Sequence, residues 1–527
     1  MDIHESLNML DYAVVLAYVV VLLGIGFWVS LRRKHTRDIF LAERSLTWPH
    51  IGFSMFGTNV SPAMMIGFCG IGYSVGMVAA NFEWLAWWFL MLLALLFAPR
   101  YLGAKVSTMP QFMELRYGKG CHTFLSWYAL ICTLLLWLSG ALYAGSLLLG
   151  QIMGWELWQS VIILTIIAAS FTVVGGLHAV AIANTFQSIL MISVSAFLGV
   201  KALCQIGGFA ALIEQVPKDH WRLFHAGGTS DYPWYAILLG YPSQAVWFWC
   251  TDQTIVQLVL GAKDLRQGQY GTVFISYLKI IAPFLFIIPG VLCFVLYPNL
   301  ADQDEAYITM VSGLLPNGLI GLIIAVIFAA LISTINSGLN SFGTILTLDI
   351  YAKKIRPDAS DKEVVLVGRC AMVFAAIIAV LCALGLSTLG KSLFDVITGI
   401  IAFLAPPMTA VFLVSVLWKR ATAKAALTTF IFGSILSLGI GFLSLTNTPE
   451  GFWPHYLLLS FYLASALIIL MIVVSLLTRP SPNIEVMPTI NEIYAKMGYS
   501  AKPVWIWYIV LFVIMIALYT FFQIASS

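Results

Sequence analysis

The sequence predicts an all-helical integral membrane protein with about fourteen transmembrane helices, ten of which form two inverted five-helix repeats. Three observations lead to this prediction. The 527 residues are 61% hydrophobic and only 10% charged, whereas soluble domains carry about 25% charged residues. Apolar runs long enough to cross a bilayer recur along the whole chain. Proline and polar residues also interrupt two of these runs at corresponding places.

The predicted spans are the apolar runs, and polar or charged segments separate them. Runs of about 17 to 25 residues suffice to cross the hydrocarbon core. We expect one domain over 1–527, with an extra first helix at 10–31, a first repeat at 47–204, a second at 233–418 and trailing helices at 424–525. The individual spans are expected at 10–31, 47–73, 82–99, 123–151, 157–176, 182–204, 233–260, 270–298, 316–350, 366–390, 393–418, 424–445, 454–478 and 503–525.

Positive charge alternates between the loops and predicts the orientation of the chain. Most of the 27 Lys and Arg residues lie in the first loop and in every second loop after it. The other loops carry only Lys201, Lys218, Arg222 and Lys391. Cytoplasmic loops are enriched in Lys and Arg. We therefore expect a cell-membrane protein, surrounded by lipid, with both termini outside.

The second span, 47–73, contains polar and helix-breaking residues at its centre: Gly57, Thr58, Asn59, Ser61 and Pro62. Proline lacks an amide hydrogen and its ring clashes with a preceding carbonyl, so we expect the helix to break near 58–62. Open backbone is tolerated at membrane depth only where it is buried in protein or lines a cavity. Freed carbonyls there can coordinate a cation. An ordinary proline kink is the alternative interpretation.

The seventh span, 233–260, resembles the second because it contains Gly240-Tyr-Pro-Ser243. Pro242 would correspond to Pro62, and each would interrupt the first helix of a five-helix unit. A unit with an odd number of spans places its copy in inverted topology. Paired interrupted helices point to the central site of a transporter, whereas two unrelated kinks would carry no such meaning.

The ninth span carries a polar face formed by Ala330, Ser333 and Thr334. The spacing i, i+3, i+4 places these residues on one side of a helix. They offer one carbonyl and two hydroxyls, and hard cations prefer oxygen ligands. Alternatively, the hydroxyls bond back to carbonyls one turn earlier in the same helix.

Three charged residues interrupt the spans: Glu83, Asp252 and Lys279. Ionisable groups within a membrane are costly and are candidates for function. Glu83 and Lys279 either pair with each other, as a structural ion pair, or hydrogen-bond a polyhydroxylated ligand. Aromatic residues that can cover a sugar ring, or that simply fill an apolar core, occur nearby: Phe68, Phe82, Trp247, Phe248, Trp249 and Phe394.

Several other classes of protein are disfavoured. The eight cysteines and eight histidines show no paired or zinc-binding spacing, so we expect neither disulfides nor a metal centre. The net charge of +3 gives no indication of nucleic-acid binding. A membrane enzyme would need a catalytic dyad or metal pattern, and a sensor would need a soluble signalling domain, which we do not expect after the last span.

Six motifs together resemble the sodium/solute symporter family, in its sodium/sugar cotransporter branch, and the resemblance runs from about residue 10 to 525. The motifs are Phe40-Leu-Ala-Glu-Arg-Ser-Leu46, Asn81-Phe-Glu-Trp84, Gly175-Gly-Leu-His-Ala-Val180, Trp249-Cys-Thr-Asp-Gln-Thr-Ile-Val-Gln257, Tyr277-Leu-Lys-Ile280 and Leu404-Ala-Pro-Pro407. The resemblance implies a LeuT-like fold with one extra first helix and three trailing helices. It also implies sodium-coupled uptake of a sugar by alternating access, and no enzymatic activity.

The resemblance also implies site residues. Sodium, the coupling ion, would bind the carbonyls of Gly57 and Val60 together with Ala330, Ser333 and Thr334. A small polar solute, most simply a sugar, would contact Glu83, Lys279, Phe248 and Trp249, with an outer gate at Phe68, Phe82 and Phe394.

The chain departs from the branch at four further positions. Met64, Ala245 and Thr398 stand where relatives usually place side-chain amides that bond sugar hydroxyls, so weak transport of glucose and galactose is expected. A sugar acid, a polyol or another small polar solute is the alternative substrate, and Lys279 is the one cation expected to be near a carboxylate. Asn184 stands where some relatives have an Asp that helps to form a second sodium site or a release path near the inner side, which predicts one sodium per substrate. Alternatively, Asn184 is a neutral variation, with a second site built elsewhere or never needed.

Overall fold

The computed structural model describes residues 8–32, 42–226, 232–316, 318–386, 393–479 and 490–527. In these ranges the regular elements are helices. Two isolated β-bridges also occur, between Leu46 and Ala262 and between His225 and Pro233. Eleven helices are long and apolar enough to cross a membrane. The all-helical class is thus confirmed. The ranges predicted at 47–73, 157–176 and 233–260 hold shorter or interrupted helices, so the count of fourteen spans stays a prediction.

The second predicted span is broken where the sequence indicates. Helix α2, Trp48–Asn59, ends before Val60 and Ser61, which adopt extended backbone, and α3, Pro62–Ser74, begins at the proline. Proline is tolerated at the first position of a helix because its missing amide hydrogen would have no partner there. The Ser61 hydroxyl accepts a hydrogen bond from the Met64 amide at 3.3 Å and caps α3. The break at 58–62 is confirmed.

The break in the seventh span lies elsewhere than predicted. Pro242 is inside helix α12, Trp234–Ala245, which continues into a π-helical turn, Val246–Thr251. The chain leaves helical geometry at Asp252, and α13, Gln253–Leu260, follows. The Asp252 carboxylate accepts a hydrogen bond from the Thr254 amide at 2.9 Å, which caps α13. The prediction that Pro242 marks the break is therefore wrong. The interruption lies at Asp252, because the Asp252 side chain caps the start of a new helix.

The fifth and sixth predicted spans form one long element, α10, Leu157–Ile206, with a kink at Gly176, where φ is 65°. Side chains other than glycine rarely adopt this backbone conformation. The kink separates the two predicted helices.

The remaining elements follow the predicted ranges, with short helices between them. Before α10 these are α1 Met9–Arg32, a turn at Ala42–Arg44, a turn at Met77–Ala79, α4 Ala80–Trp84, α5 Ala86–Leu92, a π-turn at Leu93–Phe97, α6 Ala98–Gly103, α7 Met109–Tyr117, α8 Lys119–Cys132, a π-turn at Thr133–Gly140 and α9 Ala141–Met153. After α10 they are α11 Phe209–Gln215, a turn at Lys218–Trp221, α14 Leu265–Phe286, α15 Ile288–Leu296, a turn at Gln303–Glu305, α16 Ala306–Leu314, α17 Leu319–Thr344, a π-helical end at Ile345–Ile355, α18 Asp361–Leu386, α19 Leu393–Leu417, α20 Ala423–Leu445, α21 Tyr456–Leu477, α22 Ile490–Met497 and α23 Lys502–Ser526.

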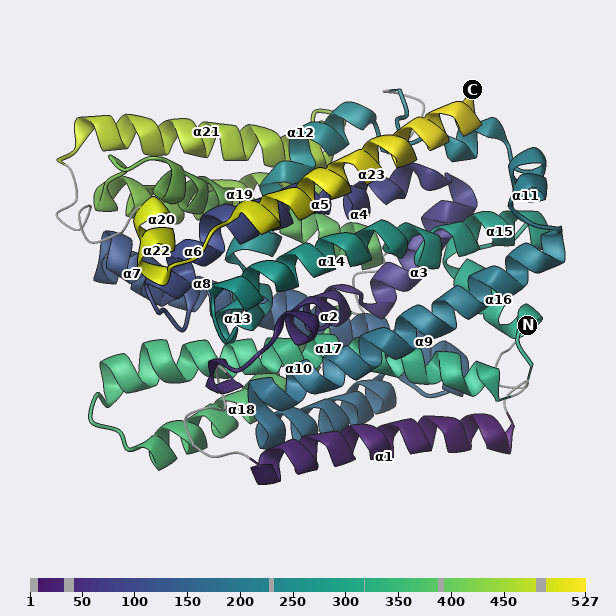
Figure 1. The fold of residues 1–527 in the computed structure, drawn as a ribbon, viewed down its shortest axis with the longest axis horizontal. Coiled ribbons are helices and arrows are strands. Elements are labelled where there is room, and N and C mark those ends of the chain that lie inside the picture. The colour runs from purple at the N-terminus through teal and green to yellow at the C-terminus, as the bar shows by residue number, and fades with distance from the viewer. Residues whose placement is uncertain (1–7, 33–41, 227–231, 317, 387–392, 480–489) are drawn as a thin grey trace.

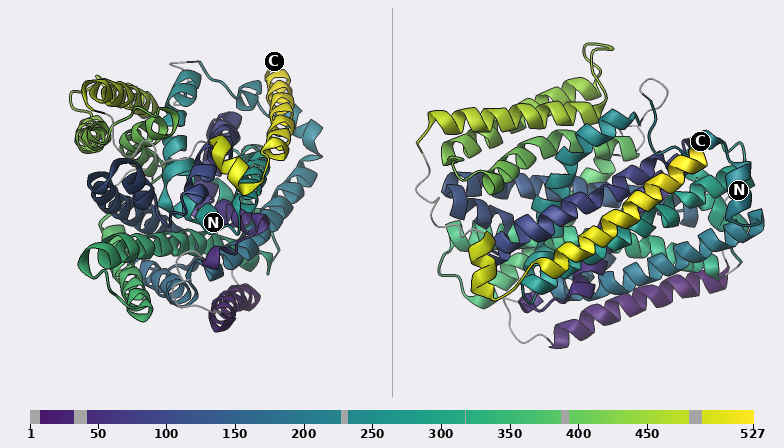
Figure 2. Two further views of the ribbon diagram at one scale, coloured as in Figure 1. Left: turned by 60° about the vertical axis from the view of Figure 1, so that its left-hand side comes forward. Right: turned by 45° about the horizontal axis from the view of Figure 1, so that its top comes forward.

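The helices form a bundle with α17 at its centre (Figure 1). Every residue of α17 from Ile323 to Thr344 is buried, and α17 packs against α2, α9, α10 and α18. Helix α1 lies at one edge of the bundle and α21 at another, and the start of α1 and the end of α23 lie at the same end of it (Figure 1, Figure 2).

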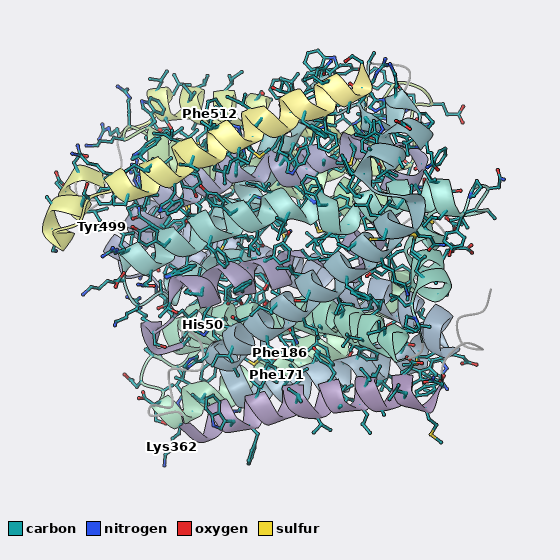
Figure 3. The ribbon with its side chains drawn as sticks, turned by 45° about the vertical axis from the view of Figure 1, so that its right-hand side comes forward. His50, Phe171, Phe186, Lys362, Tyr499 and Phe512 are labelled. Carbon is teal, nitrogen blue, oxygen red and sulfur yellow. The ribbon has the colours of Figure 1, made fainter. Side chains whose placement is uncertain are left out.

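The outer surface of the bundle is apolar. Large hydrophobic side chains on the peripheral helices are exposed, such as Phe27 on α1, Ile435 on α20 and Ile506 on α23. Phe512 of α23 is 42% exposed on the same surface (Figure 3). A surface of this kind suits contact with lipid tails rather than water.

We predict that Gly290→Ala destabilises the fold. Gly290 on α15 faces α3 so closely that an added Cβ would lie 1.9 Å from the carbonyl oxygen of Cys69. The backbones would have to separate, and overpacking typically costs about 1–3 kcal/mol. Thermal unfolding of the purified protein should show a lower melting temperature. Gly199→Ala on α10 is the matched control, because nothing lies within 4 Å of its added Cβ; equal melting temperatures for the two variants would contradict this packing.

Candidate functional site

A cavity lies next to the break between α2 and α3. Its empty volume is about 1160 Å³, part of which is open to solvent. Most lining side chains are apolar or aromatic, with a few polar groups among them, which is typical of small-molecule sites. The lining residues are Thr58, Asn59, Ser61, Met64, Phe68, Phe82, Glu83, Leu136, Trp137, Gly140, Ala141, Tyr241, Gln244, Ala245, Trp247, Phe248, Trp249, Thr334 and Ile401.

The cavity brings together most of the predicted substrate and gate residues. Those that line it are Glu83, Phe248, Trp249, Met64, Ala245, Phe68 and Phe82. Lys279 is not among the lining residues. Phe394 and Thr398 lie at the start of α19, where the side chains of 393–398 are outside the described part of the chain. The proposed site is therefore assembled from segments that are distant in the sequence.

Glu83 and Lys279 form a buried ion pair at the edge of the cavity. The Lys279 ammonium donates to both carboxylate oxygens of Glu83, at 2.8 and 2.6 Å, and also to the side-chain oxygen of Asn59. An ammonium has three protons to donate, so these contacts use all of them. The two side chains are 3% and 1% exposed. The nitrogen of Lys279 also lies 5.1 Å from the ring centre of Trp249.

This pairing leaves little free charge in the cavity. Truncating one partner of a buried ion pair typically costs about 3–5 kcal/mol, because the other charge is left without compensation. The first of the two interpretations from the sequence, a pair between Glu83 and Lys279, matches the structure. Glu83 still lines the cavity and retains unused acceptor positions on its oxygens.

The predicted sodium residues meet at the end of α2. The Ser333 hydroxyl donates to the Gly57 carbonyl. The Thr334 hydroxyl lies 3.2 Å from the Thr58 carbonyl and 3.1 Å from the Ala330 carbonyl. The face identified on span nine therefore points at the break, as expected, and the Thr334 hydroxyl also bonds back within its own helix.

Val60 and Thr58 differ from the expectation for this cluster. Val60 is buried in the extended backbone of the break, but the described part of α17 donates no hydrogen bond to its carbonyl. Thr58, which the sequence analysis did not include among the sodium residues, supplies that carbonyl instead. Its position within the predicted break was the available signal.

The oxygens at this point fit a hard monovalent cation. The cluster offers carbonyl and hydroxyl oxygens without any carboxylate, and oxygen is the ligand that such ions prefer. Gly57 allows the close approach: an added Cβ would lie 2.6 Å from the Ser188 hydroxyl and 3.4 Å from that of Ser333. A larger residue would therefore displace the Ser188 hydroxyl, which donates to the Phe53 carbonyl at 2.7 Å.

A second polar layer lies directly behind this cluster. The Thr58 and Ser337 hydroxyls are 2.8 Å apart. The Asn184 amide nitrogen lies within hydrogen-bond distance of both, at 3.2 and 3.3 Å, and 3.1 Å from the Ser54 hydroxyl. The side-chain oxygen of Asn184 is buried with no partner. Ser337 could have been found from the sequence, since it follows Ser333 and Thr334 by one turn of the same helix.

Asp252, the third charged residue in the spans, does not line the cavity. Its carboxylate caps α13, so its position is explained by the fold. Sequence reasoning assigned no role to three polar or aromatic groups of the cavity wall, Trp137, Tyr241 and Gln244. It identified Thr58, Asn59 and Ser61 only as part of the break. The Tyr241 hydroxyl donates to the Phe82 carbonyl at 2.7 Å, which holds α12 against α4.

Comparison with known proteins places this geometry in context. A model of the sodium:solute symporter family matches residues 39–433. Sodium/glucose cotransporter 4 from Danio rerio is 33% identical, over 91% of this chain and 80% of the relative. A sodium/mannose cotransporter from Bos taurus is 33% identical, over 83% of this chain and 79% of the relative.

A solved structure shares the fold. A Na+-coupled sialic acid symporter, in a substrate-bound outward-open state, superimposes with a TM-score of 0.78 at 21% identity, over 90% of this chain and 99% of that one. The family model and the sequence relatives together show the family. The chain belongs to the sodium:solute symporter family, whose members are membrane transporters rather than enzymes and use sodium as the coupling ion.

Proposed function

We propose that this protein carries a neutral sugar or sugar-like solute into the cell together with sodium, by alternating access. The observation that carries this proposal is that Thr58 and Thr334 belong both to the oxygen cluster at the break and to the wall of the cavity. Two binding sites that share residues are coupled directly, because occupation of one changes the position of groups in the other.

Aromatic side chains and a carboxylate suit a sugar in this cavity. Apolar ring faces cover the C–H faces of a sugar ring, and Glu83 accepts hydrogen bonds from hydroxyls. The names of the relatives, sodium/glucose and sodium/mannose cotransporters, support a sugar. We propose Glu83, Phe248, Trp249, Met64, Ala245 and Thr398 as its contacts, with Lys279 acting through Glu83, and Phe68, Phe82 and Phe394 as the outer gate.

The charge pair argues for a neutral substrate. Lys279 donates all its protons to Glu83 and Asn59, so it has none left for the carboxylate of a sugar acid. A sugar acid would bring a negative charge beside Glu83, and the described residues that line the cavity include no free cation to balance it. Uncharged sugars and polyols avoid this cost.

Sodium is proposed to bind where α2 ends. The carbonyls of Gly57, Val60 and Ala330 and the hydroxyls of Ser333 and Thr334 are the proposed ligands, with the Thr58 carbonyl as an addition from the structure. An ion at this point would join α2 to α17. It would hold the break in the form that keeps the neighbouring cavity ready for substrate.

The proposed membrane arrangement follows the sequence. Ten of the fourteen proposed spans form an inverted repeat at 47–204 and 233–418, with one span at 10–31 before it and three at 424–525 after it. Interrupted first helices in both units support the repeat. The common end of the bundle at which α1 starts and α23 finishes supports an even number of spans. We propose the cytoplasmic membrane as the location and the outside for both termini.

We predict that Ser333→Ala and Thr334→Ala each abolish most sodium-dependent uptake in proteoliposomes, because each removes a hydroxyl oxygen from the proposed sodium site. Thr344→Ala is the matched control: the Thr344 hydroxyl also bonds back within α17, to the Asn340 carbonyl at 2.7 Å, but it does not face α2. Normal sodium dependence in both Ser333→Ala and Thr334→Ala would refute the assignment.

We predict that Glu83→Gln weakens substrate binding more than Asp252→Asn does, when binding is measured at saturating sodium. Glu83 lines the cavity, whereas Asp252 caps a helix. Because Glu83→Gln leaves Lys279 without its counter-charge, the double variant Glu83→Gln/Lys279→Met serves as the control. It should recover thermal stability and not binding; recovery of binding as well would show that the pair is only structural.

We predict a transport ratio of one sodium per substrate. Asn184 retains an oxygen but lacks the charge that offsets the desolvation of a second cation, and its amide nitrogen already contacts three hydroxyls. Reversal potentials measured in proteoliposomes at fixed substrate gradients give the ratio. A fitted value of two would contradict this interpretation of Asn184. If the value is one, Asn184→Asp tests whether the added charge allows a second ion to bind.

A further inference from the structure

Gln244 differs from the other buried glutamines of the described chain. It lies at the end of α12, lines the cavity and is only 6% exposed. Its side-chain nitrogen is buried without a hydrogen-bond partner, and no described residue bonds to its side-chain oxygen. The amide is therefore both buried and unsatisfied within the protein.

Each of the other buried glutamines makes at least one side-chain hydrogen bond, although the oxygens of Gln187 and Gln269 have no partner among the described residues. The oxygen of Gln253 accepts from the Met109 amide at 2.9 Å, and the nitrogen of Gln257 donates to the Ser337 carbonyl at 3.0 Å. The nitrogen of Gln269 donates to the Ala94 carbonyl at 2.8 Å. Buried polar groups are nearly always hydrogen-bonded, so an unsatisfied amide at a cavity wall indicates a partner that comes from outside the chain.

Neighbouring groups on α12 differ from Gln244. The Ser243 hydroxyl is also buried without a partner among the described residues, but Ser243 does not line the cavity. The Tyr241 hydroxyl, one turn earlier, donates to the Phe82 carbonyl, and the Ser243 carbonyl accepts from the Thr409 hydroxyl. Ala245 follows directly and has no polar side chain. Gln244 is thus a cavity-lining residue of α12 whose side-chain amide has no hydrogen-bond partner among the described residues.

We propose that Gln244 binds the transported solute and determines which sugar is accepted, an inference that rests on the proposed sugar transport. Its amide would hydrogen-bond a hydroxyl of a neutral sugar, and a hydroxyl both donates and accepts, so either end of the amide fits. Successive residues of a helix point about 100° apart. The Gln244 amide therefore approaches the substrate from a different direction than an amide at position 245, where relatives usually have one. It would select sugars whose hydroxyls are arranged differently from those that an amide at 245 selects.

Stability without substrate provides the first test. Replacing an unpartnered buried amide by an apolar group of similar shape is neutral or stabilising, whereas removing a partnered one is destabilising. Gln244→Met should keep or raise the melting temperature of the substrate-free protein. Gln269→Met, the matched control, should lower it. If Gln244→Met lowers the melting temperature as much as Gln269→Met, the amide has a partner within the protein and the proposal is wrong.

Substrate selection provides the second test. Sodium-dependent uptake of D-glucose, D-galactose, D-mannose, D-fructose and myo-inositol is compared in the wild type, Gln244→Met and Gln244→Asn. Loss of one hydrogen bond corresponds to about a 2- to 10-fold lower affinity. Gln244→Met should lose this factor for the preferred solute, flatten the ranking of the five solutes and leave the sodium dependence unchanged, and Gln244→Asn should recover part of the affinity.

Equal affinities of Gln244→Met and the wild type for every transported solute would overturn the proposal. Absence of sodium-dependent uptake of all five solutes by the wild type would instead contradict sugar transport as the proposed function. In that case the comparison of melting temperatures still decides whether the Gln244 amide is free of protein partners.

Discussion

Open backbone inside an apolar bundle has to find hydrogen-bond partners, and this constraint governs the centre of the structure. Where α2 ends, the carbonyls of Gly57 and Thr58 accept hydrogen bonds from the hydroxyls of Ser333 and Thr334 on α17. Without such donors the break at Pro62 would leave unsatisfied carbonyls at membrane depth, which is strongly unfavourable. The arrangement depends on a glycine at 57, because an added Cβ would lie 2.6 Å from the Ser188 hydroxyl, and on the buried stretch of α17 from Ile323 to Thr344. The same oxygens are the ones we propose as ligands of the ion.

The charge pair of Glu83 and Lys279 imposes a second constraint, which extends to the last helix. Glu83 lies on α4, beside Asn81 and Trp84. The Tyr519 hydroxyl of α23 donates to the Asn81 side chain at 2.8 Å, and the Trp84 indole donates to the Ile280 carbonyl of α14 at 3.1 Å, next to Lys279. Helix α23 also contacts α14, because the Tyr277 hydroxyl donates to the Trp507 carbonyl at 2.8 Å, so it packs against both segments that carry the pair. A helix at the lipid-facing surface thus helps to keep the polar edge of the cavity in register.

Local signals in the sequence were sufficient for some features and not for others. The break at Pro62 and the shared face of Ala330, Ser333 and Thr334 follow from proline geometry and helical spacing, which act within a few residues. The second break depends on Asp252, which caps α13. Both Pro242 and Asp252 could have interrupted this span, and their positions in the sequence do not decide between them. The isolation of the Gln244 amide could not be predicted, because it depends on which distant segments surround it. The same holds for the preference of Thr334 for the Thr58 carbonyl over that of Val60.

The mutual hydrogen bonds of the oxygen cluster would also set how firmly a sodium ion is held at the proposed site. Each hydroxyl that turned its lone pairs toward sodium would have to redirect the proton it now shares with a carbonyl, so entry of the ion would exchange one set of contacts for another. The net gain in binding free energy would be smaller than the number of ligands suggests. With no carboxylate in the cluster, the proposed site would bind the ion weakly and release it once it faced a compartment in which sodium is scarce. Weak binding of this kind would allow the carrier to return and begin another cycle.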